Sequence, residues 1–289
     1  MKVSSRAIQA DLPAMKAQHP ELFTPSWLRR GTIIGIVSLL AGVFVFGFWR
    51  LGFSFEKIIA GIGQFGTLLW LMLPPDPGSW ARFLAFSNAL AETVAIAFLG
   101  TLLAALIAFP IGFIAARNTT VNRLVQFASR RVLDGIRGID TLIWALLWIN
   151  VVGLGPFAGV LAIMTSDIGT FGKLFSEAIE AADKKPVEGI ASTGGTRLHQ
   201  IRFGILPQVF PVIAGQVLYF FESNTRSGTI IGIVGAGGIG LHLAEQIRTL
   251  EWQAVSFLVI MILIMVAAID AVSVRLRTAI IGRAQQPTV

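Results

Sequence analysis

The sequence predicts an all-α integral membrane protein with about six transmembrane helices and both termini in the cytoplasm. Of its 289 residues, 54% are hydrophobic and 13% charged, whereas soluble domains carry about 25% charged residues. Mean hydropathy is +0.74, and the apolar residues are clustered in runs. Eighteen of the 23 basic residues fall in segments that this topology places inside, as expected for cytoplasmic loops.

Six apolar segments are the predicted spans, because a helix rising 1.5 Å per residue needs roughly 20 residues to cross the hydrocarbon core. They are residues 32–49, 86–115, 135–154, 156–178, 207–225 and 254–274. The first lacks a small-residue cleavage pattern, so we interpret it as an uncleaved span and not as a signal peptide. Pro110 is expected to kink the second span. The sequence GLGP at 153–156 predicts a tight reversal after the third.

Residues 50–85 include LPPDPGSW and are rich in proline and glycine, which is typical of a connection outside the membrane. Within them, residues 58–72 are apolar and form either an amphipathic helix along the interface or a seventh span. A seventh span would put the later basic loops on the wrong side, so six spans are preferred.

Composition also excludes several classes of function. The chain has no cysteine, which rules out disulfides, thiolate catalysis and cysteine-ligated metals. Its three histidines are scattered, so no metal site is expected. The net charge of +7 is explained by basic cytoplasmic loops rather than by nucleic-acid binding.

The segment TIIGIVGAGGIG at 229–240 contains a literal match to the G-x-G-x-x-G dinucleotide fingerprint. That motif requires a strand before it and an acidic residue about 20 positions later. Glu245 and Glu251 are too close, and a membrane span follows. We therefore interpret these glycines as small residues that let helices approach each other or line a cavity.

Residues 180–211 form the longest internal polar segment and predict helix, turn, helix. Pro186 suits a first helical turn, Gly194-Gly195 permits a sharp reversal, and Thr196 can begin a second short helix. Leu206-Pro207 then re-enters the membrane.

This segment resembles the cytoplasmic coupling loop of ABC-importer permeases, whose pattern is E-A-A, three residues, G, nine residues, I-x-L-P. Glu188 is at the acidic position of this pattern, Gly194 is at the position of the turn glycine, and Leu206-Pro207 is the Leu-Pro pair that ends it. Gly189-Ile190 stand in place of the two alanines, and Gly204 in place of the isoleucine. FLGTLLAALIAFPIGFIAARN at 98–118 and the segment 220–248 resemble the permease subunit of phosphonate-type importers, which carry phosphonate, phosphite or phosphate.

The resemblance implies a type I ABC importer (MetI-like) permease in the plasma membrane, which is a transport subunit and not an enzyme. Its parts would be a cytoplasmic segment 1–30, a first helix and connection 31–84, a permease core 85–277 with the coupling loop at 186–207, and a tail 278–289. The implied partners are two ATPase subunits, a second permease copy and an extracytoplasmic solute-binding protein. No cofactor is expected, since the chain lacks a G-x-x-x-x-G-K-[ST] loop and the partner ATPase would bind the ATP.

Two sets of candidate site residues follow. In the coupling loop, polar rim contacts are expected from Glu188, Arg197 and Arg202, and apolar anchors from Ile190 and Leu198. The ATPase-coupling set is Glu188, Gly194, Arg197, Leu198, Leu206 and Pro207. The set along the substrate path is Glu222, Asn224, Arg226, Ser227, Gly235, Gly237, Gly238 and Gly240.

Ionisable residues inside spans are expensive and face protein or water. Six such residues lie in or at the ends of the predicted spans: Glu92, Asp140, Asp167, Glu222, Arg226 and Asp270. Two roles are open for Arg226. It either pairs with Glu222 at the outer end of the fifth span, or it offers hydrogen-bond donors to a passing oxyanion. In the second role Asn224, Thr225 and Ser227 would add further donors. Asp270 is expected to pair with a cytoplasmic arginine.

The sequence is also compatible with a different class of protein, an ion-coupled secondary transporter that uses intramembrane carboxylates. Glu92, Asp167 or Asp270 would then relay protons. Such a protein needs no ATPase, and it leaves the helix–turn–helix loop unexplained.

Overall fold

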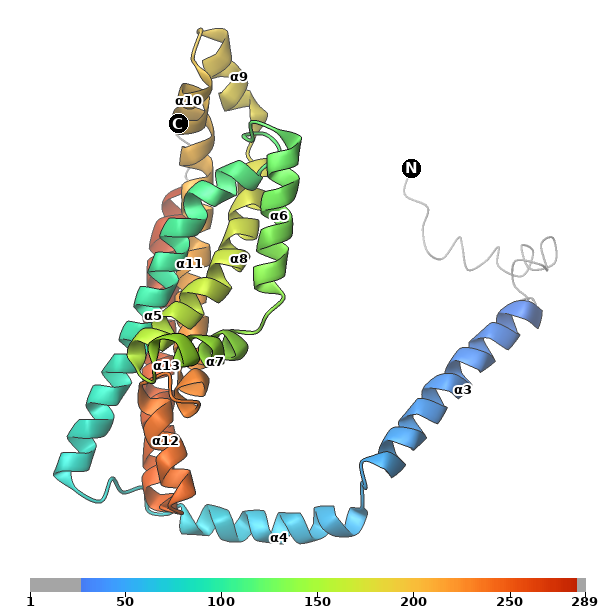
Figure 1. Ribbon diagram of the computed structural model, residues 1–289, viewed down its shortest axis with the longest axis vertical. Coiled ribbons are helices and arrows are strands. Elements are labelled where there is room, and N and C mark those ends of the chain that lie inside the picture. Colours follow the sequence, from blue (N-terminus) through green and yellow to red (C-terminus); the bar gives the residue numbers. More distant parts are fainter. Residues whose placement is uncertain (1–26, 285–289) are drawn as a thin grey trace, which may run out of the picture. The chain divides into compact units, whose positions relative to one another are not determined.

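The computed structural model describes residues 27–284 (Figure 1), and every regular element within them is a helix. The elements are α3 (Trp27–Arg50), α4 (Phe55–Leu71), α5 (Trp80–Ala115), α6 (Arg123–Arg137), α7 (Thr141–Val152), α8 (Pro156–Glu180), α9 (Lys184–Ser192), α10 (Arg197–His199), the π-helical turn η1 (Gln200–Ile205), α11 (Leu206–Ile233), α12 (Ile239–Arg248) and α13 (Trp252–Ala284). Most of the predicted segment 1–30 and the end of the tail 278–289 lie outside the described residues.

The chain divides into two compact units, residues 1–67 and 68–289, which we describe separately. In the first unit, α3 contains the predicted span 32–49, and most of the apolar side chains between Ile33 and Trp49 are exposed, as expected for side chains that face lipid. α4 corresponds to the segment 58–72 and has no buried residue. Its 17 residues are not among the helices long and apolar enough to cross a membrane.

Four helical stretches are long and apolar enough to cross a membrane: Arg30–Arg50, Trp80–Ala115, Arg197–Ile233 and Trp252–Ala279. The count rises to five if the bent pair α6 and α7 is one span. α8 contains the predicted span 156–178 but carries several polar residues and is not counted. Six spans and cytoplasmic termini therefore stay predictions.

The predicted span 135–154 is not one continuous helix, and its crossing of the membrane stays a prediction. α6 and α7 are separate helices bent by 87°. The break is local: Gly138 ends α6, and the Asp140 carboxylate accepts a hydrogen bond from Leu142 N to begin α7. The 12 residues of α7 extend only about 18 Å at 1.5 Å per residue.

Ion pairs explain how the arginine-rich α6 joins the bundle instead of lying in a loop. Arg130 Nη2 is 2.7 Å from Glu180 Oε1, and Lys173 Nζ is 2.7 Å from Asp134 Oδ1. Both pairs connect α6 to α8, so the two helices compensate each other's charges.

The fifth and sixth spans are longer than predicted. α11 continues to Ile233 and α13 to Ala284, whereas the predicted ends are 225 and 274. Arg226 consequently lies seven residues before the end of α11 and not at its outer end. The helix continues through Gly228, where α5 packs closely: an added Cβ would lie 3.2 Å from Thr93 Cγ2.

Small residues set the packing of α5 against α8, the most extensive helix pair in the second unit. An added Cβ on Gly100 would lie 2.8 Å from Ile163 Cβ, and one on Gly112 would lie 2.8 Å from Phe175 Cβ. Phe171, Phe175 and Ile179 fill the core between these helices and α11. α5 continues through Pro110 as one helix. α9 and α10 project from one end of this bundle, and α12 lies at the other (Figure 1).

Candidate functional site

The elbow, which we define as residues 183–207, has the predicted helix–turn–helix form. α9 begins after Asp183, whose carboxylate accepts a hydrogen bond from Lys185 N at 3.1 Å. Gly194 turns the chain with a φ of +82°, a conformation that favours glycine. Thr196 begins α10 and forms a capping box with His199. The elbow therefore has defined structure at both ends.

The departures from the family pattern have a packing reason. Gly204 is buried where η1 passes α9, and an added Cβ there would lie 3.1 Å from Val187 Cγ2 and 3.3 Å from Ile190 Cδ1. Ile190 thus occupies the space that a side chain at 204 would need. Relative to the family pattern, the isoleucine lies on the other side of this contact, and the total side-chain volume is smaller by about one methyl group.

This packing corrects the predicted role of Ile190 as an anchor for a partner. Ile190 faces inward and is only half-exposed, whereas Leu198 is 76% exposed. Glu188 and Pro207 are also exposed, and Leu206 is half-buried. Glu188 and Leu198 are therefore more open to a partner than Ile190, which packs within the elbow.

Two of the predicted rim arginines already have partners within the chain. Arg197 Nη2 donates to the Thr120 carbonyl at 2.8 Å, which connects the elbow to the α5–α6 connection. The Arg202 guanidinium lies 5.4 Å from the centre of the Phe203 ring. Arg197 is thus an internal link as well as a surface residue.

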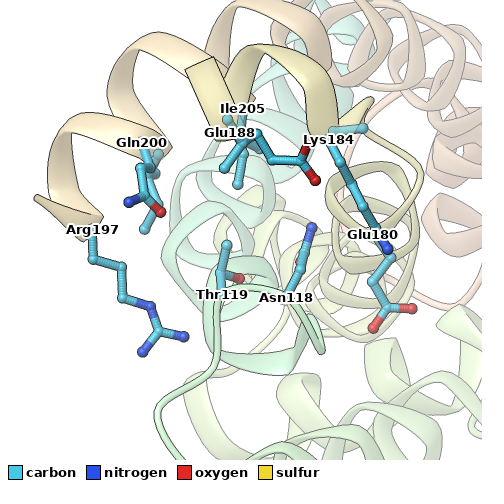
Figure 2. A pocket seen from close by; sticks show the side chains of 11 residues that line it. Asn118, Thr119, Glu180, Lys184, Glu188, Arg197, Gln200 and Ile205 are labelled. Atoms are coloured by element: carbon cyan, nitrogen blue, oxygen red, sulfur yellow. The ribbon is translucent and has the colours of Figure 1, made fainter. Parts of the chain in front are cut away.

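A cavity of about 250 Å³ lies beneath the elbow. Figure 2 shows Asn118 and Thr119 opposite Glu188 and Gln200 across it. Its floor is fixed by Glu180, which accepts hydrogen bonds from Arg117 N at 2.6 Å and Arg130 Nη2 at 2.7 Å. The end of α8 and the α5–α6 connection therefore support the elbow from below.

The glycine-rich segment forms a buried turn between α11 and α12. The helix α11, and not a strand, comes directly before it, so the dinucleotide motif lacks its structural context. Gly235, Gly237 and Gly238 have positive φ values. Gly238 N donates to Glu92 Oε1 at 2.7 Å, and Ile239 N donates to the Thr93 hydroxyl at 2.8 Å. Glu92 thus holds this turn in place.

Steric space explains why these positions are glycines. A Cβ on Gly237 would lie 2.7 Å from Glu92 Oε1 and 2.8 Å from Pro156 N. On Gly240 it would overlap the Thr229 carbonyl oxygen. Gly235, Gly237, Gly238 and Gly240 are all buried. They pack α11 and α12 against α5 and α8, and their assignment to a substrate path stays a prediction.

A second buried polar cluster joins three helices. Asn224 Nδ2 on α11 donates to Asp167 Oδ2 on α8 at 2.5 Å and to the Thr101 hydroxyl on α5 at 2.8 Å. All three residues are at least 94% buried. Both amide hydrogens of Asn224 are engaged, so the expectation that Asn224 donates to a passing anion is wrong. Thr225 is also buried, and its hydroxyl donates to the Phe221 carbonyl.

Glu222 connects two arginines. Arg226 Nη1 lies 2.9 Å from Glu222 Oε1, which is the predicted pair, and Arg277 Nη2 of α13 lies 3.5 Å from Glu222 Oε2. The glutamate side chain is 12% exposed, whereas Arg226 is 48% and Arg277 32% exposed. We call these three residues the charge triad. Ser227, beside it on α11, is half-buried.

Other predicted residues are separate from the triad. Asp140 is the N-cap of α7, and His199 is exposed, as expected. Asp270 is exposed and forms no ion pair with any side chain in the described part of the chain, so its expected arginine partner is not found. Sequence reasoning missed Arg277 because an arginine after an apolar run was counted as a cytoplasmic residue.

Solved structures of ABC transporters share this fold. A chain of the MetNI methionine ABC transporter in an inward-facing conformation superposes with a TM-score of 0.61 and 17% sequence identity. The superposition covers 70% of this chain and 99% of that one. A chain of an amino acid ABC transporter gives a TM-score of 0.57 with 16% identity, over 70% of this chain and 98% of that one. At these identities the likeness shows the fold.

The sequence shows the family. The model for the binding-protein-dependent transport system inner membrane component matches residues 108–286, and the chain belongs to this family. HtxC of Stutzerimonas stutzeri, whose name assigns it to a phosphite transport system, is 39% identical over 86% of each chain. The phosphite transport system permease protein PtxC of the same organism is 34% identical over 92% of this chain and 95% of its own. The protein is thus a multi-pass permease of the plasma membrane.

Proposed function

We propose that this permease conducts a phosphonate-, phosphite- or phosphate-type oxyanion into the cell as part of an ATP-driven importer. Two copies of the chain would form the path, two ATPase subunits would bind and hydrolyse ATP, and a solute-binding protein would deliver the anion from outside. The permease itself would bind no cofactor.

The elbow is the observation that supports this mechanism. It is braced from below by Glu180 and tied by Arg197 to the α5–α6 connection, and it leads directly into α11. A force applied to the exposed Glu188 and Leu198 would therefore reach α5, α8 and α11 without being lost in a loose loop. Such a rigid lever suits the transmission of movement from a separate ATPase.

The substrate class rests on the relatives and on charge. HtxC and PtxC carry phosphite in their names, and the phosphate-import permease PhnE of Mycolicibacterium smegmatis is 34% identical over 79% of this chain and 42% of its own. The charge triad has a net charge of +1 within candidate spans. Arginine can bind two oxygens of such an anion at once.

Glu188→Arg tests the coupling role of the elbow. We expect ATP-dependent uptake to fall by about tenfold or more, since each 1.4 kcal/mol lost from a rim contact is a factor of ten, and copurification of the ATPase to weaken. The measurement is uptake of phosphite by cells that carry the complete importer, with equal permease in the membrane.

Glu177→Arg is the matched control, because Glu177 is an exposed glutamate of α8 that does not line the cavity beneath the elbow. Its uptake should stay within about twofold of the unmodified protein, as for most surface substitutions. Normal transport by Glu188→Arg would contradict the lever mechanism. Uptake that survives ATP depletion but collapses with a protonophore would instead favour the secondary transporter.

A further inference from the structure

A basic surface lies on α6 and on the face of α8 that packs against it, separate from the charge triad. We call it the α6 basic surface. Five of its charged residues are basic and three are acidic, so two positive charges are in surplus. They are Arg123, Arg130, Arg131, Asp134 and Arg137 of α6 with Lys173, Glu177 and Glu180 of α8.

Arg131 is the basic residue of this surface that is most available to a ligand. Arg130 already pairs with Glu180, and Lys173 Nζ lies 2.7 Å from Asp134 Oδ1. Arg131 Nη1 makes a longer contact of 3.4 Å with Asp134 Oδ2, and its side chain is 65% exposed. A guanidinium has five N–H donors. Most donors of Arg131 therefore point to the surroundings and not to the chain.

The exposed side chains near Arg131 on α6 are largely apolar. Leu124, Phe127 and Val132 are 71%, 58% and 61% exposed. The Arg131 guanidinium lies 5.1 Å from the centre of the Phe127 ring, which turns it toward the start of α6 at the elbow end of the bundle (Figure 1). A face that combines exposed arginine with leucine and phenylalanine is typical of a helix at the boundary between acyl chains and headgroups.

A small cavity of about 160 Å³ lies beside Arg131. Arg130, Asp134 and Lys173 contribute to its walls. Such a cavity has room for a phosphate group, whereas the chains of a lipid would stay outside, against the exposed apolar side chains. Basic pockets between membrane helices are sites of the kind that bind anionic headgroups.

We propose that the α6 basic surface binds the phosphate of an anionic phospholipid, with Arg131 as the main headgroup contact. The planar fork of Arg131 can bind two phosphate oxygens at once, and Leu124 and Phe127 lie against the upper part of the acyl chains. A zwitterionic lipid has the same phosphate but adds its own positive charge, so it does not compensate the surplus. The inference does not depend on which anion the importer carries.

The bound lipid also supports the elbow. Arg130, next to Arg131 in sequence, donates to Glu180 at 2.7 Å and to the Ala115 carbonyl at 3.0 Å. These bonds join α6 to the ends of α5 and α8, where Glu180 fixes the floor of the cavity beneath the elbow. A lipid that neutralises the surplus charge of α6 stabilises this junction, because like charges close together repel one another.

The absence of cysteine from the chain allows a test at a chosen position. Leu124→Cys is labelled with bimane, and the assembled importer is reconstituted in phosphatidylcholine bilayers. Phosphatidylglycerol or phosphatidylcholine with a doxyl spin label near the headgroup is then added as quencher. We expect phosphatidylglycerol to quench with about fivefold higher apparent affinity, since one basic residue contributes about 1 kcal/mol toward an anionic lipid and about 1.4 kcal/mol is a factor of ten. The unmodified importer gives the background from partner thiols.

Phe210→Cys is the matched probe, because Phe210 is 59% exposed near the elbow end of α11 and has no basic residue within one turn of its helix. It should show no preference between the two lipids. In the Leu124→Cys protein, Arg131→Gln should reduce the preference to about one, and Arg131→Lys, which keeps the charge, should retain most of it. Arg248→Gln, which removes an exposed arginine of α12, should change nothing.

Four results would overturn the lipid site. Equal quenching by both lipids at Leu124→Cys would show that the headgroup is not recognised. A preference that survives Arg131→Gln would place recognition elsewhere. The absence of quenching by either lipid would show that protein, such as a second copy of the chain, covers this surface. A preference that millimolar inorganic phosphate removes would assign the cavity to the free anion and not to a lipid.

A second measurement needs no probe. Phosphatidylglycerol added to the delipidated importer in detergent should raise the unfolding temperature of the unmodified permease more than that of Arg131→Gln. Phosphatidylcholine should raise both equally. An equal effect of phosphatidylglycerol on the two proteins would contradict the role of Arg131 as the headgroup contact.

Discussion

At the residue scale, Gly237 determines whether the turn between α11 and α12 can form. Its φ is +82°, and the position of a Cβ is already occupied by Glu92 and Pro156. Glycine is needed here for two independent reasons, conformation and space. In a nucleotide-binding protein the same glycine pattern lets the backbone approach a phosphate group. In this protein it lets helices approach one another.

Gly237→Ala should destabilise the folded protein by more than about 1 kcal/mol, because alanine disfavours positive φ and its methyl group meets the chain. Gly189→Ala is the control: this exposed helical glycine has nothing within 4 Å of an added Cβ, so alanine should stabilise by about 0.5–1 kcal/mol. Thermal unfolding of the purified importer compares the two. Equal unfolding temperatures for Gly237→Ala and the unmodified protein would contradict this account.

Charged residues inside spans show why residue type alone does not assign a role. Glu92 holds the glycine turn, and Asp167 is held by Asn224. Only Glu222 connects to arginines beside an open groove. From the sequence, all three were expected to face protein or a water-filled path. Their partners in the structure give Glu92 and Asp167 structural roles and leave Glu222 as the candidate for a role in transport.

At the scale of elements, the elbow is a small folded unit with its own apolar contact. Ile190 of α9 lies against Gly204 of η1, whereas the family pattern has alanine and isoleucine at these two positions. The exchange keeps the contact filled from the opposite side. It explains how the chain departs from the pattern and still forms the elbow.

Gly204→Ile should therefore disrupt the elbow, since overpacking a fitted contact costs about 1–3 kcal/mol. We expect most ATP-driven uptake to be lost. The double variant Ile190→Ala with Gly204→Ile returns to the family arrangement and should regain uptake. Transport by Gly204→Ile at the normal rate, or a double variant no better than the single one, would show that this contact does not matter.

At the scale of the whole molecule, the second unit joins helices that are distant in sequence through short polar links. Asn224, Asp167 and Thr101 connect α11, α8 and α5 at one buried point. The elbow lies at one end of this bundle and the α12–α13 connection at the other (Figure 1). In the proposed importer these two ends face opposite sides of the membrane.

Single-cysteine labelling tests that orientation. Leu198→Cys at the elbow and Glu251→Cys in the α12–α13 connection are both exposed positions. An impermeant thiol reagent added to intact cells should label Glu251→Cys and spare Leu198→Cys, because the elbow must face the ATPase inside. In inside-out vesicles the pattern should reverse. Labelling of the elbow from outside would invalidate the proposed topology.

The sequence alone determined the membrane class, the helical elements and the elbow. Each depends on local properties: apolar runs, glycine and proline at turns, and capping residues such as Thr196. The same local reasoning failed at 135–154, where Gly138 ends one helix and Asp140 begins the next across a sharp bend. It also ended the fifth span at 225, whereas α11 continues to Ile233.

Only the tertiary structure decided which side chains meet. Arg277 and Glu222 are 55 residues apart in sequence, and no local pattern indicates that α13 brings the arginine to α11. The same holds for Gly238 and Glu92, and for Asn224 and Asp167. Local chemistry determines where helices begin and end, whereas the partners of a buried charge depend on how distant helices pack.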